Sequence, residues 1–321
     1  MKYLSLLAKL TIFRLSIRAL LSSALLMSTL LSSALLSSSA YASEGQHGIQ
    51  VGHSQQRQGF TFEDQSLAIA VGSNTLQYQY SQSDWLIGFA LSRADGEKTA
   101  AGDRAYQFDF DSRTTSVFAE MSLDDFWLGM GFSQGIDDSQ YRINRSIVSG
   151  EVNDQSDFDN VSIDVGYGQF LASSYWSVST SLTQQWLDTK KTLKLSRTEK
   201  PLLNQQSNAT EQALFAGLNA RYEYYFTLSD RYELALSGAL NHQFTLSGDG
   251  RIQLNQQRQG PRGVQKSQRS EELTSSVSAT TALSARVSLL YSRYSLSAEM
   301  DQLTDQSAAD AYYGIGLGVS F

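Results

Sequence analysis

The sequence predicts an all-β chain that closes into a single up-and-down antiparallel transmembrane β-barrel. Three observations support this prediction: apolar residues recur at every second position, short turns alternate with long polar connections, and the last strand ends on an aromatic residue. Beyond the N-terminal region, no segment offers about 18 uninterrupted apolar residues, so membrane-spanning helices are not expected. A barrel strand is apolar on one face only, which agrees with the slightly negative mean hydropathy.

The first 42 residues have the composition of an export signal. Four basic residues and no acidic residue precede position 19, and a serine-diluted apolar stretch follows at 19–36. Ala40-Tyr41-Ala42 then matches the small-x-small pattern of a cleavage site, with Ala40 and Ala42 as the small residues. We therefore predict a signal peptide over 1–42. The alternative is an uncleaved membrane anchor, because the basic region is unusually long.

Charge and cysteine content exclude several function classes. The whole chain has a net charge of −7, and removal of the four basic residues of the signal leaves about −11. Such an acidic chain is not expected to bind nucleic acid. The absence of cysteine removes disulfides, thiolate metal sites and cysteine nucleophiles. No cofactor and no metal are predicted.

The C-terminal segment shows the clearest alternation. One face of 313–321 is large and apolar, and the other face holds three glycines and a serine. The segments 160–168, 214–226 and 277–289 alternate in the same way. A soluble sandwich could show this pattern too, with its apolar face as the core. Alternation therefore predicts strands without deciding which face meets water.

The connections between strands separate into two kinds. Five are short and flanked by Tyr, Trp or Phe, at 81–84, 122–125, 172–174, 228–230 and 291–293. Five are longer and polar, at 93–104, 134–157, 188–209, 246–271 and 302–310. Short turns at one end and long loops at the other are typical of outer-membrane barrels, and rings of aromatic residues mark the lipid headgroup level. This asymmetry favours the membrane barrel over the sandwich.

The turns also give a strand number. Five turns join ten strands, the C-terminal strand adds one, and a first upward strand over 62–72 would make twelve. A tight turn at Gly72-Ser73-Asn74 would join this first strand to the next. Ten or fourteen strands remain alternatives, all of them even as single-chain bacterial barrels require. The polar segment 43–58 is predicted to be a flexible periplasmic extension, and 59–321 to be the barrel.

Parts of the chain resemble bacterial outer-membrane barrel proteins of the autotransporter-like and porin-like kind. The last strand looks like their assembly signal, in which apolar residues alternate up to a terminal aromatic: Tyr313, Ile315, Leu317, Val319 and Phe321. The segments 83–89 and 123–132 resemble hairpins of autotransporter-like barrels. About sixteen residues separate the predicted cleavage site from the barrel, so no passenger domain is expected.

This resemblance implies a location and a set of partners. The protein would lie in the outer membrane of a Gram-negative bacterium, with its C-terminus in the periplasm and its long loops outside the cell. It would contact outer-membrane lipid and lipopolysaccharide and would be recognised by the barrel-assembly machinery. The resemblance does not indicate an oligomeric state.

Histidine placement argues against an enzyme. A hydrolase in such a barrel would need a histidine beside Ser, Asp or Glu near the rim. His47 and His53 lie in the predicted extension, and His242 is predicted to face outward, between Leu240 and Phe244. No catalytic, cofactor-binding or metal-binding residue is therefore predicted.

The alternation instead predicts charged residues on the inner wall. These candidate lumen-lining residues are Asp109, Asp111, Asp164, Arg221, Glu223, Glu233, Arg286 and Glu299. Between them the predicted inner face is mostly Gly, Ser and Ala. We therefore predict a narrow water-filled pore for small solutes or ions. The alternative is a closed structural barrel whose basic loops, 190–200 and 251–269, bind lipopolysaccharide or a partner. Autotransporter-type translocation and lipid or peptide hydrolysis agree less well with the sequence.

Overall fold

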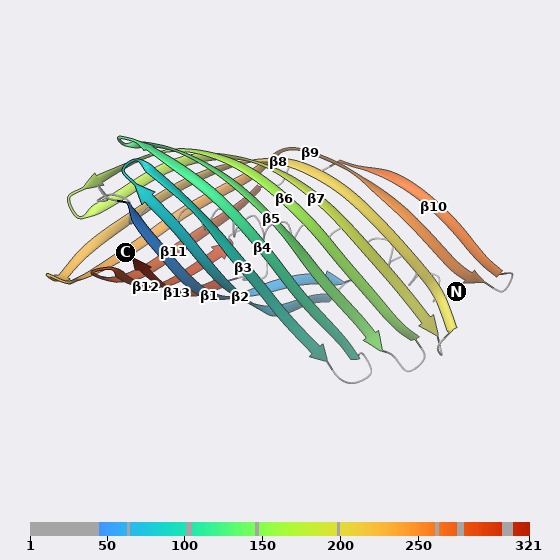
Figure 1. The fold of residues 1–321 in the computed structure, drawn as a ribbon. Helices are drawn as coiled ribbons and strands as arrows, with labels where there is room; N and C mark the ends of the chain where they lie inside the picture. Colours follow the sequence, from blue (N-terminus) through green and yellow to red (C-terminus); the bar gives the residue numbers. More distant parts are fainter. Residues whose placement is uncertain are drawn as a thin grey trace.

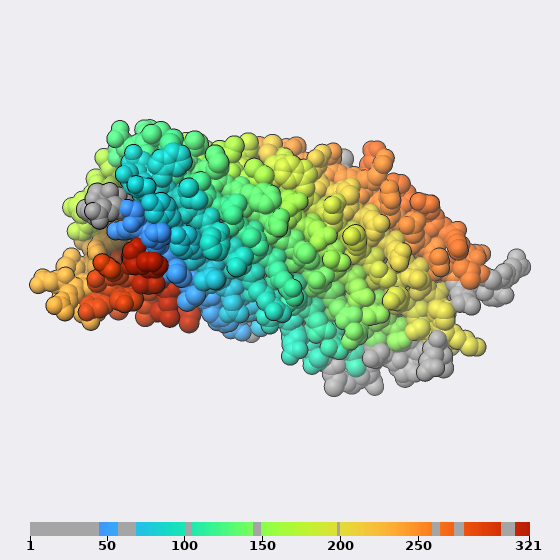
Figure 2. Space-filling view, in the orientation of Figure 1, coloured from blue at the N-terminus to red at the C-terminus, as the bar shows by residue number. Residues whose placement is uncertain are grey.

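The computed structural model describes one closed antiparallel barrel (Figures 1 and 2). The described residues are 45–62, 65–100, 105–144, 148–197, 200–260, 263–274, 279–303 and 311–321. The predicted signal peptide, 1–42, lies outside the described residues. Among the described residues, no helix is long and apolar enough to cross a membrane.

Long strands make up nearly all of the described chain. They are β1 (Gln46–Phe62), β2 (Gln65–Gln82), β3 (Trp85–Ala100), β4 (Ala105–Leu123), β5 (Phe126–Asn144), β6 (Val148–Leu171), β7 (Ser174–Arg197), β8 (Lys200–Ser229), β9 (Tyr232–Gly260), β10 (Gly263–Thr274), β11 (Ala279–Tyr291), β12 (Tyr294–Leu303) and β13 (Ala311–Ser320). Consecutive strands pair with each other, except that β11 pairs with β9 and not with β10, and β1 closes the barrel against β13.

The barrel has twelve strand positions, although thirteen segments are labelled. β10 pairs with the part of β9 between Asp249 and Gly260, whereas β11 pairs with the part between Tyr232 and Phe244. The two segments therefore share one position beside β9, whose other edge pairs with β8. The predicted count of twelve is confirmed.

The start of the barrel differs from the prediction. Residues 46–58 are not a flexible extension, because they lie in β1 and pair with both β2 and β13. His47 and Phe321 exchange two backbone hydrogen bonds of 2.8 Å. The predicted turn at 72–74 is also wrong, because β2 passes through it without interruption. Glutamine, serine and histidine dilute the apolar alternation of β1, and this concealed the strand.

The five short turns are confirmed, and their backbone explains their length. Each is a two-residue connection, and four of them begin with a non-glycine residue at positive φ: Ser83, Asp124, Ala172 and Ser292, with φ between 48° and 55°. A positive φ at this position gives the turn a twist that matches the right-handed twist of the flanking strands. All five turns lie at the end of the barrel that also holds the C-terminus (Figure 1).

The long polar connections are mostly strand rather than loop. β7 and β8 have 24 and 30 residues, and their pairing continues to Arg197 and Lys200. The hairpins of β5 to β10 therefore project well beyond the shorter strands β11 to β13 (Figure 1). The outer face of a strand becomes polar once it leaves the lipid, so apolar residues at alternate positions no longer mark the outward face there.

The outer face of the barrel is apolar in the half that carries the short turns. We call this half the lower one, and the end with the long hairpins the upper one. Large apolar side chains are exposed at alternate positions, for example Leu128, Met130 and Phe132 on β5 and Val161, Ile163 and Val165 on β6. Aromatic residues are exposed beside the short turns: Trp85, Phe126, Phe170, Tyr232 and Tyr294. This apolar belt with an aromatic girdle is the surface of a barrel surrounded by lipid.

Candidate functional site on the inner wall

Inward residues alternate along each strand with the exposed apolar residues of the belt, so the belt identifies the inward positions. On β7, Val178 and Leu182 are exposed, while Ser177 and Thr183 are buried. At belt level the inward residues are mostly small: Gly129, Gly131 and Ser133 on β5, Ser177, Ser179 and Ser181 on β7, and Gly314, Gly316 and Gly318 on β13. Small side chains leave room inside the barrel.

Several large inward side chains lie against the wall. A Cβ atom on Gly166 would overlap the Trp127 ring on the neighbouring strand, and a Cβ atom on Gly88 would overlap Phe118. Each ring thus rests on a glycine of the next strand and does not have to project toward the barrel axis. Trp127 therefore belongs to the inner wall, although the sequence places it beside an aromatic-flanked turn.

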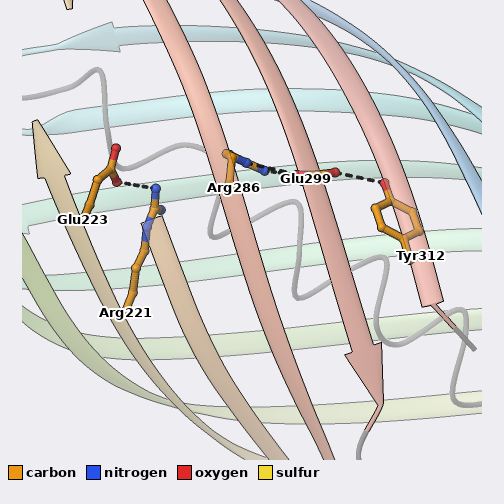
Figure 3. Close-up of polar contacts among 5 residues, drawn as sticks. All are labelled: Arg221, Glu223, Arg286, Glu299 and Tyr312. Carbon is orange, nitrogen blue, oxygen red and sulfur yellow. Dashed lines mark hydrogen bonds and ion pairs between the residues drawn. The ribbon is translucent and has the colours of Figure 1, made fainter. Parts of the chain in front are cut away.

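Arg221 and Glu223 form a buried ion pair on β8 (Figure 3). Arg221 Nη2 donates to Glu223 Oε2 at 2.6 Å, and the residues are only 8% and 4% exposed. A buried charge is stable only with a partner, so each residue fixes the other against the wall. Both were predicted to face inward, and the structure places them there.

Arg286 on β11 and Glu299 on β12 form a second pair, which Tyr312 on β13 extends (Figure 3). Arg286 Nε donates to Glu299 Oε2 at 3.0 Å, and the Tyr312 hydroxyl donates to Glu299 Oε1 at 3.0 Å. A Cβ atom on Gly314 would lie 3.0 Å from Glu299 Oε1, so glycine there makes room for the carboxylate.

The two ion pairs lie along one row of register partners that crosses the inner wall. Ser237 on β9 is the register partner of Glu223 on β8 and of Arg286 on β11. Arg286 is in turn opposite Glu299, and Glu299 is opposite Gly314. Charged residues on β8, β11 and β12 therefore lie along one row of register partners, with Ser237 on β9 between Glu223 and Arg286.

Further acids face inward from the same part of the wall. Glu120 and Asp164 are both register partners of Gly129, and Asp164 was predicted to face inward. Asp301 on β12 is buried, and neither of its carboxylate oxygens has a hydrogen-bond partner. Glu233 also alternates inward, as predicted. Glu120 and Asp301 were missed as lumen residues, although they lie three residues and one residue from the exposed Val117 and Met300, and odd offsets place them on the opposite, inward face.

Asp109 and Asp111 do not line the lumen, so their assignment is corrected. Phe108 and Phe110 on the same strand are buried and face inward, which leaves the two aspartates on the outer face. Asp111 accepts hydrogen bonds from the exposed Arg93 and Arg113, which are also ion-pair partners. The prediction placed the charged residues of this alternating strand on the inner face. Above the belt the aromatic residues of this strand face inward and the aspartates face outward, because the outer face meets water there.

An apolar cluster lies inside this upper part of the barrel. Ile69, Val71, Ala94, Phe108 and Phe110 pack together from three neighbouring strands. Tyr106 and Tyr141 pack against the cluster. The inner wall is therefore polar and charged at belt level and partly apolar above it.

A further ion pair lies above the belt. Lys191 Nζ is 3.4 Å from Asp154 Oδ2, and both side chains are largely buried. Burial raises the pKa of Asp154 and lowers the pKa of Lys191, and the attraction between the two opposes each shift. The sequence did not single out this pair, because it lies in a region that was predicted to be loop.

The three histidines lie on the outward face of the barrel. His242 lies on the outward face, as predicted, and its Nδ1 is 2.9 Å from Thr281 Oγ1. His47 faces outward from β1 and contacts Tyr78 and the Phe321 ring. Within the described ranges, no group of His, Cys, Asp and Glu has an arrangement that could hold a metal ion.

Comparisons with known proteins find relatives by structure alone. No protein-family model matches the chain, and no curated protein matches it by sequence. The translocator domain of the autotransporter NalP from Neisseria meningitidis is similar with a TM-score of 0.63 and 10% identity, over 94% of this chain and 96% of that chain. The β domain of the Bordetella autotransporter BrkA is similar with a TM-score of 0.57 and 14% identity, over 87% of this chain and all of that chain, 100%. The chain therefore shares its fold, a closed antiparallel β-barrel, with these two translocator domains.

Proposed function

We propose that this barrel is a narrow, water-filled pore for small solutes and ions in the outer membrane of a Gram-negative bacterium. In this proposal the short turns and the C-terminus face the periplasm, and the long hairpins of β5 to β10 face the outside. The apolar belt supports the membrane location. Twelve strands support a narrow pore, because eight strands fill with side chains and sixteen leave a wide channel.

The observation that supports the pore most directly is the chemistry of its wall. Small residues line the belt level, bulky rings lie over glycines, and the charged residues are held against the strands. A structural barrel has no need of a charged interior, because buried charges cost more free energy than packed apolar residues. Glu120, Asp164 and Glu233 are only partly buried, and a charge that borders the water of a pore costs less free energy than a charge in a packed interior.

The charge balance of the wall predicts a preference for cations. Among the described residues at belt level, six acids and two bases face inward: Glu120, Asp164, Glu223, Glu233, Glu299 and Asp301 against Arg221 and Arg286. Both arginines are paired with glutamates. The remaining acids make the lumen negative, which raises the local concentration of cations.

Reversal potentials across a planar bilayer test this proposal. Under a gradient of KCl, we expect the native barrel to pass K⁺ in preference to Cl⁻. The double variant Glu120→Gln/Asp164→Asn should reduce the permeability ratio by about twofold, because it removes two of the unpaired inward acids. The variant Asp95→Asn/Asp109→Asn is the matched control, since it removes two acids from the outer face. No current, or an equal effect of the two double variants, would count against the pore.

A further inference from the structure

The sheet has an open edge at the upper end of the barrel. β10 is the last strand in the hydrogen-bonded order of the sheet and, within the described residues, it pairs only with β9. The strands that follow stop lower, because β12 ends at Leu303, opposite Ala282 on β11, and β13 begins at Ala311. No described strand therefore lies along the other edge of β10, which is the outermost arrow of the projecting sheet (Figure 1).

The side chains along this edge are accessible. Every residue from Val264 to Ser270 is exposed, and Val264 has 59% of its surface exposed. Successive side chains of a strand point to opposite faces, so a covered face would bury every second residue. The unbroken exposure shows that both faces of β10 meet water, and a partner has room beside it.

The backbone of β10 can form a further ladder. An edge strand presents a row of unpaired N–H and C=O groups, to which another chain can pair. In an antiparallel pair, every second residue directs both of its backbone groups to the same neighbour. β10 has 12 residues, so about six of them direct these groups away from β9. This length suffices for an added strand of ordinary size.

The outer-face side chains indicate the composition of a strand that would fit. Gln206 on β8, Asn255 on β9 and Gln268 on β10 are register partners in turn, and all three are exposed. Closer to the membrane, Arg251 on β9 is opposite Glu272 on β10. Amide rows and opposite charges on neighbouring strands stabilise a sheet. A strand with an amide beside Gln268 and a base beside Glu272 would continue both rows.

The charges of β10 also separate along its length. Lys266 and Arg269 lie toward the hairpin tip, and Glu271 and Glu272 lie toward the membrane. Arg269 Nη2 is 2.6 Å from Glu271 Oε1, and the Arg269 side chain is 74% exposed. A complementary strand therefore carries acids opposite Lys266 and Arg269. If it runs antiparallel to β10, its base lies toward its N-terminus and its acids lie toward its C-terminus.

We infer that the open edge of β10, which we call the β10 edge, binds an extended strand of an extracellular polypeptide by strand addition. The strand runs antiparallel to β10, as neighbouring strands of the barrel do. Its backbone supplies the affinity, and the side-chain rows fix its register.

A second copy of the barrel does not fit this edge. Two β10 strands paired antiparallel would point their barrels in opposite directions, which barrels in one membrane cannot do. The inference rests on the proposed orientation, in which the long hairpins face the outside. It does not need a conducting lumen.

Binding of a synthetic peptide tests the inference. The probe is fluorescein-labelled Thr-Lys-Thr-Asn-Glu-Gln-Thr-Glu-Thr, which places its lysine opposite Glu272 and its glutamates opposite Arg269 and Lys266. A second peptide has lysine and glutamate exchanged. Fluorescence anisotropy with the purified barrel should show about tenfold tighter binding of the probe, because its charges match the β10 edge. If net charge alone decided, the acidic barrel would prefer the exchanged peptide, which is more basic.

Two barrel variants locate the binding. Lys266→Glu/Arg269→Glu should reverse the preference, so that the exchanged peptide binds more tightly than the probe. Lys190→Glu/Lys194→Glu is the matched control. It reverses two exposed bases on the outer face of β7, which is paired along both of its edges. This control should keep the preference of the native barrel, and an equal effect of the two variants would overturn the inference.

Backbone methylation distinguishes strand addition from simple charge attraction. Two versions of the probe carry N-methyl groups on alternate residues, one on the odd and one on the even positions. Only one set of N–H groups points at β10, so one version should lose binding and the other should keep it. Equal binding of both versions, or no binding of the probe at millimolar concentration, would overturn the inference. A barrel that binds the probe but passes no current would support the β10 edge and contradict the pore.

Discussion

Replacement of Arg221 by methionine should lower the free energy of unfolding by about 3 to 5 kcal/mol. The change leaves the Glu223 carboxylate without the guanidinium 2.6 Å away, in a place where only 4% of the residue is exposed. Most of the loss comes from the uncompensated buried charge rather than from the bond itself. Urea unfolding in lipid vesicles, followed by the electrophoretic shift between folded and unfolded barrel, measures the change.

Two further variants make this prediction specific. Arg221→Met/Glu223→Gln removes both charges and should recover more than half of the loss. Arg93→Met is the matched control, because Arg93 pairs with Asp111 on the outer face and is 61% exposed. An exposed pair contributes about 0 to 1 kcal/mol. An equal loss of unfolding free energy in Arg221→Met and Arg93→Met would contradict this prediction, because it would mean that the inner pair is as well solvated as the exposed outer pair.

The second large effect is expected at Gly166. In Gly166→Ala the new methyl group would overlap the Trp127 ring, which has to leave the wall. We expect a loss of about 1 to 3 kcal/mol, as for other overpacked sites. The displaced ring would also enter the lumen, so the single-channel conductance should fall. The same unfolding assay and a bilayer recording give the two values.

Gly52→Ala is the matched control for this effect. A Cβ atom on Gly52 would lie 3.6 Å from the Ile315 carbonyl oxygen, which is an ordinary contact. Trp127→Ala/Gly166→Ala should restore stability toward that of Trp127→Ala alone, because the overlap is gone. If Gly166→Ala behaves like Gly52→Ala, the ring does not depend on the glycine and the wall is less tightly packed than described.

The sequence was sufficient to predict the barrel because lipid imposes a strict rule on it. Every second residue at belt level must be apolar, so Tyr222 and Tyr224 on the outside place Arg221 and Glu223 on the inside. The count of twelve strands followed from the five short turns, the C-terminal strand and the even strand number of single-chain barrels. β1 was missed because His47 precedes Ile49 and Val51 on its outward face, and His53 and Gln55 follow them.

The rest of the inner wall could not be predicted, for two physical reasons. Above the belt both faces border water or protein, so the sequence of Phe108 and Asp109 does not say which one faces inward. Contacts across strands also depend on register. Trp127 meets Gly166, 39 positions away, only because β5 and β6 pair as they do. Alternation alone predicts which face of the sheet a residue is on. It does not predict which residue lies opposite on the next strand.

Cysteine modification tests the central claim, that the inner wall borders a conducting lumen, most directly. The chain has no cysteine, so a single introduced one reports its own position. Ser181 faces inward and Thr180, its neighbour on β7, faces outward between Val178 and Leu182. In a planar bilayer, the water-soluble reagent 2-sulfonatoethyl methanethiosulfonate should lower the current through Ser181→Cys and leave Thr180→Cys unchanged. An unchanged current through modified Ser181→Cys, with the modification verified by mass, would contradict the account.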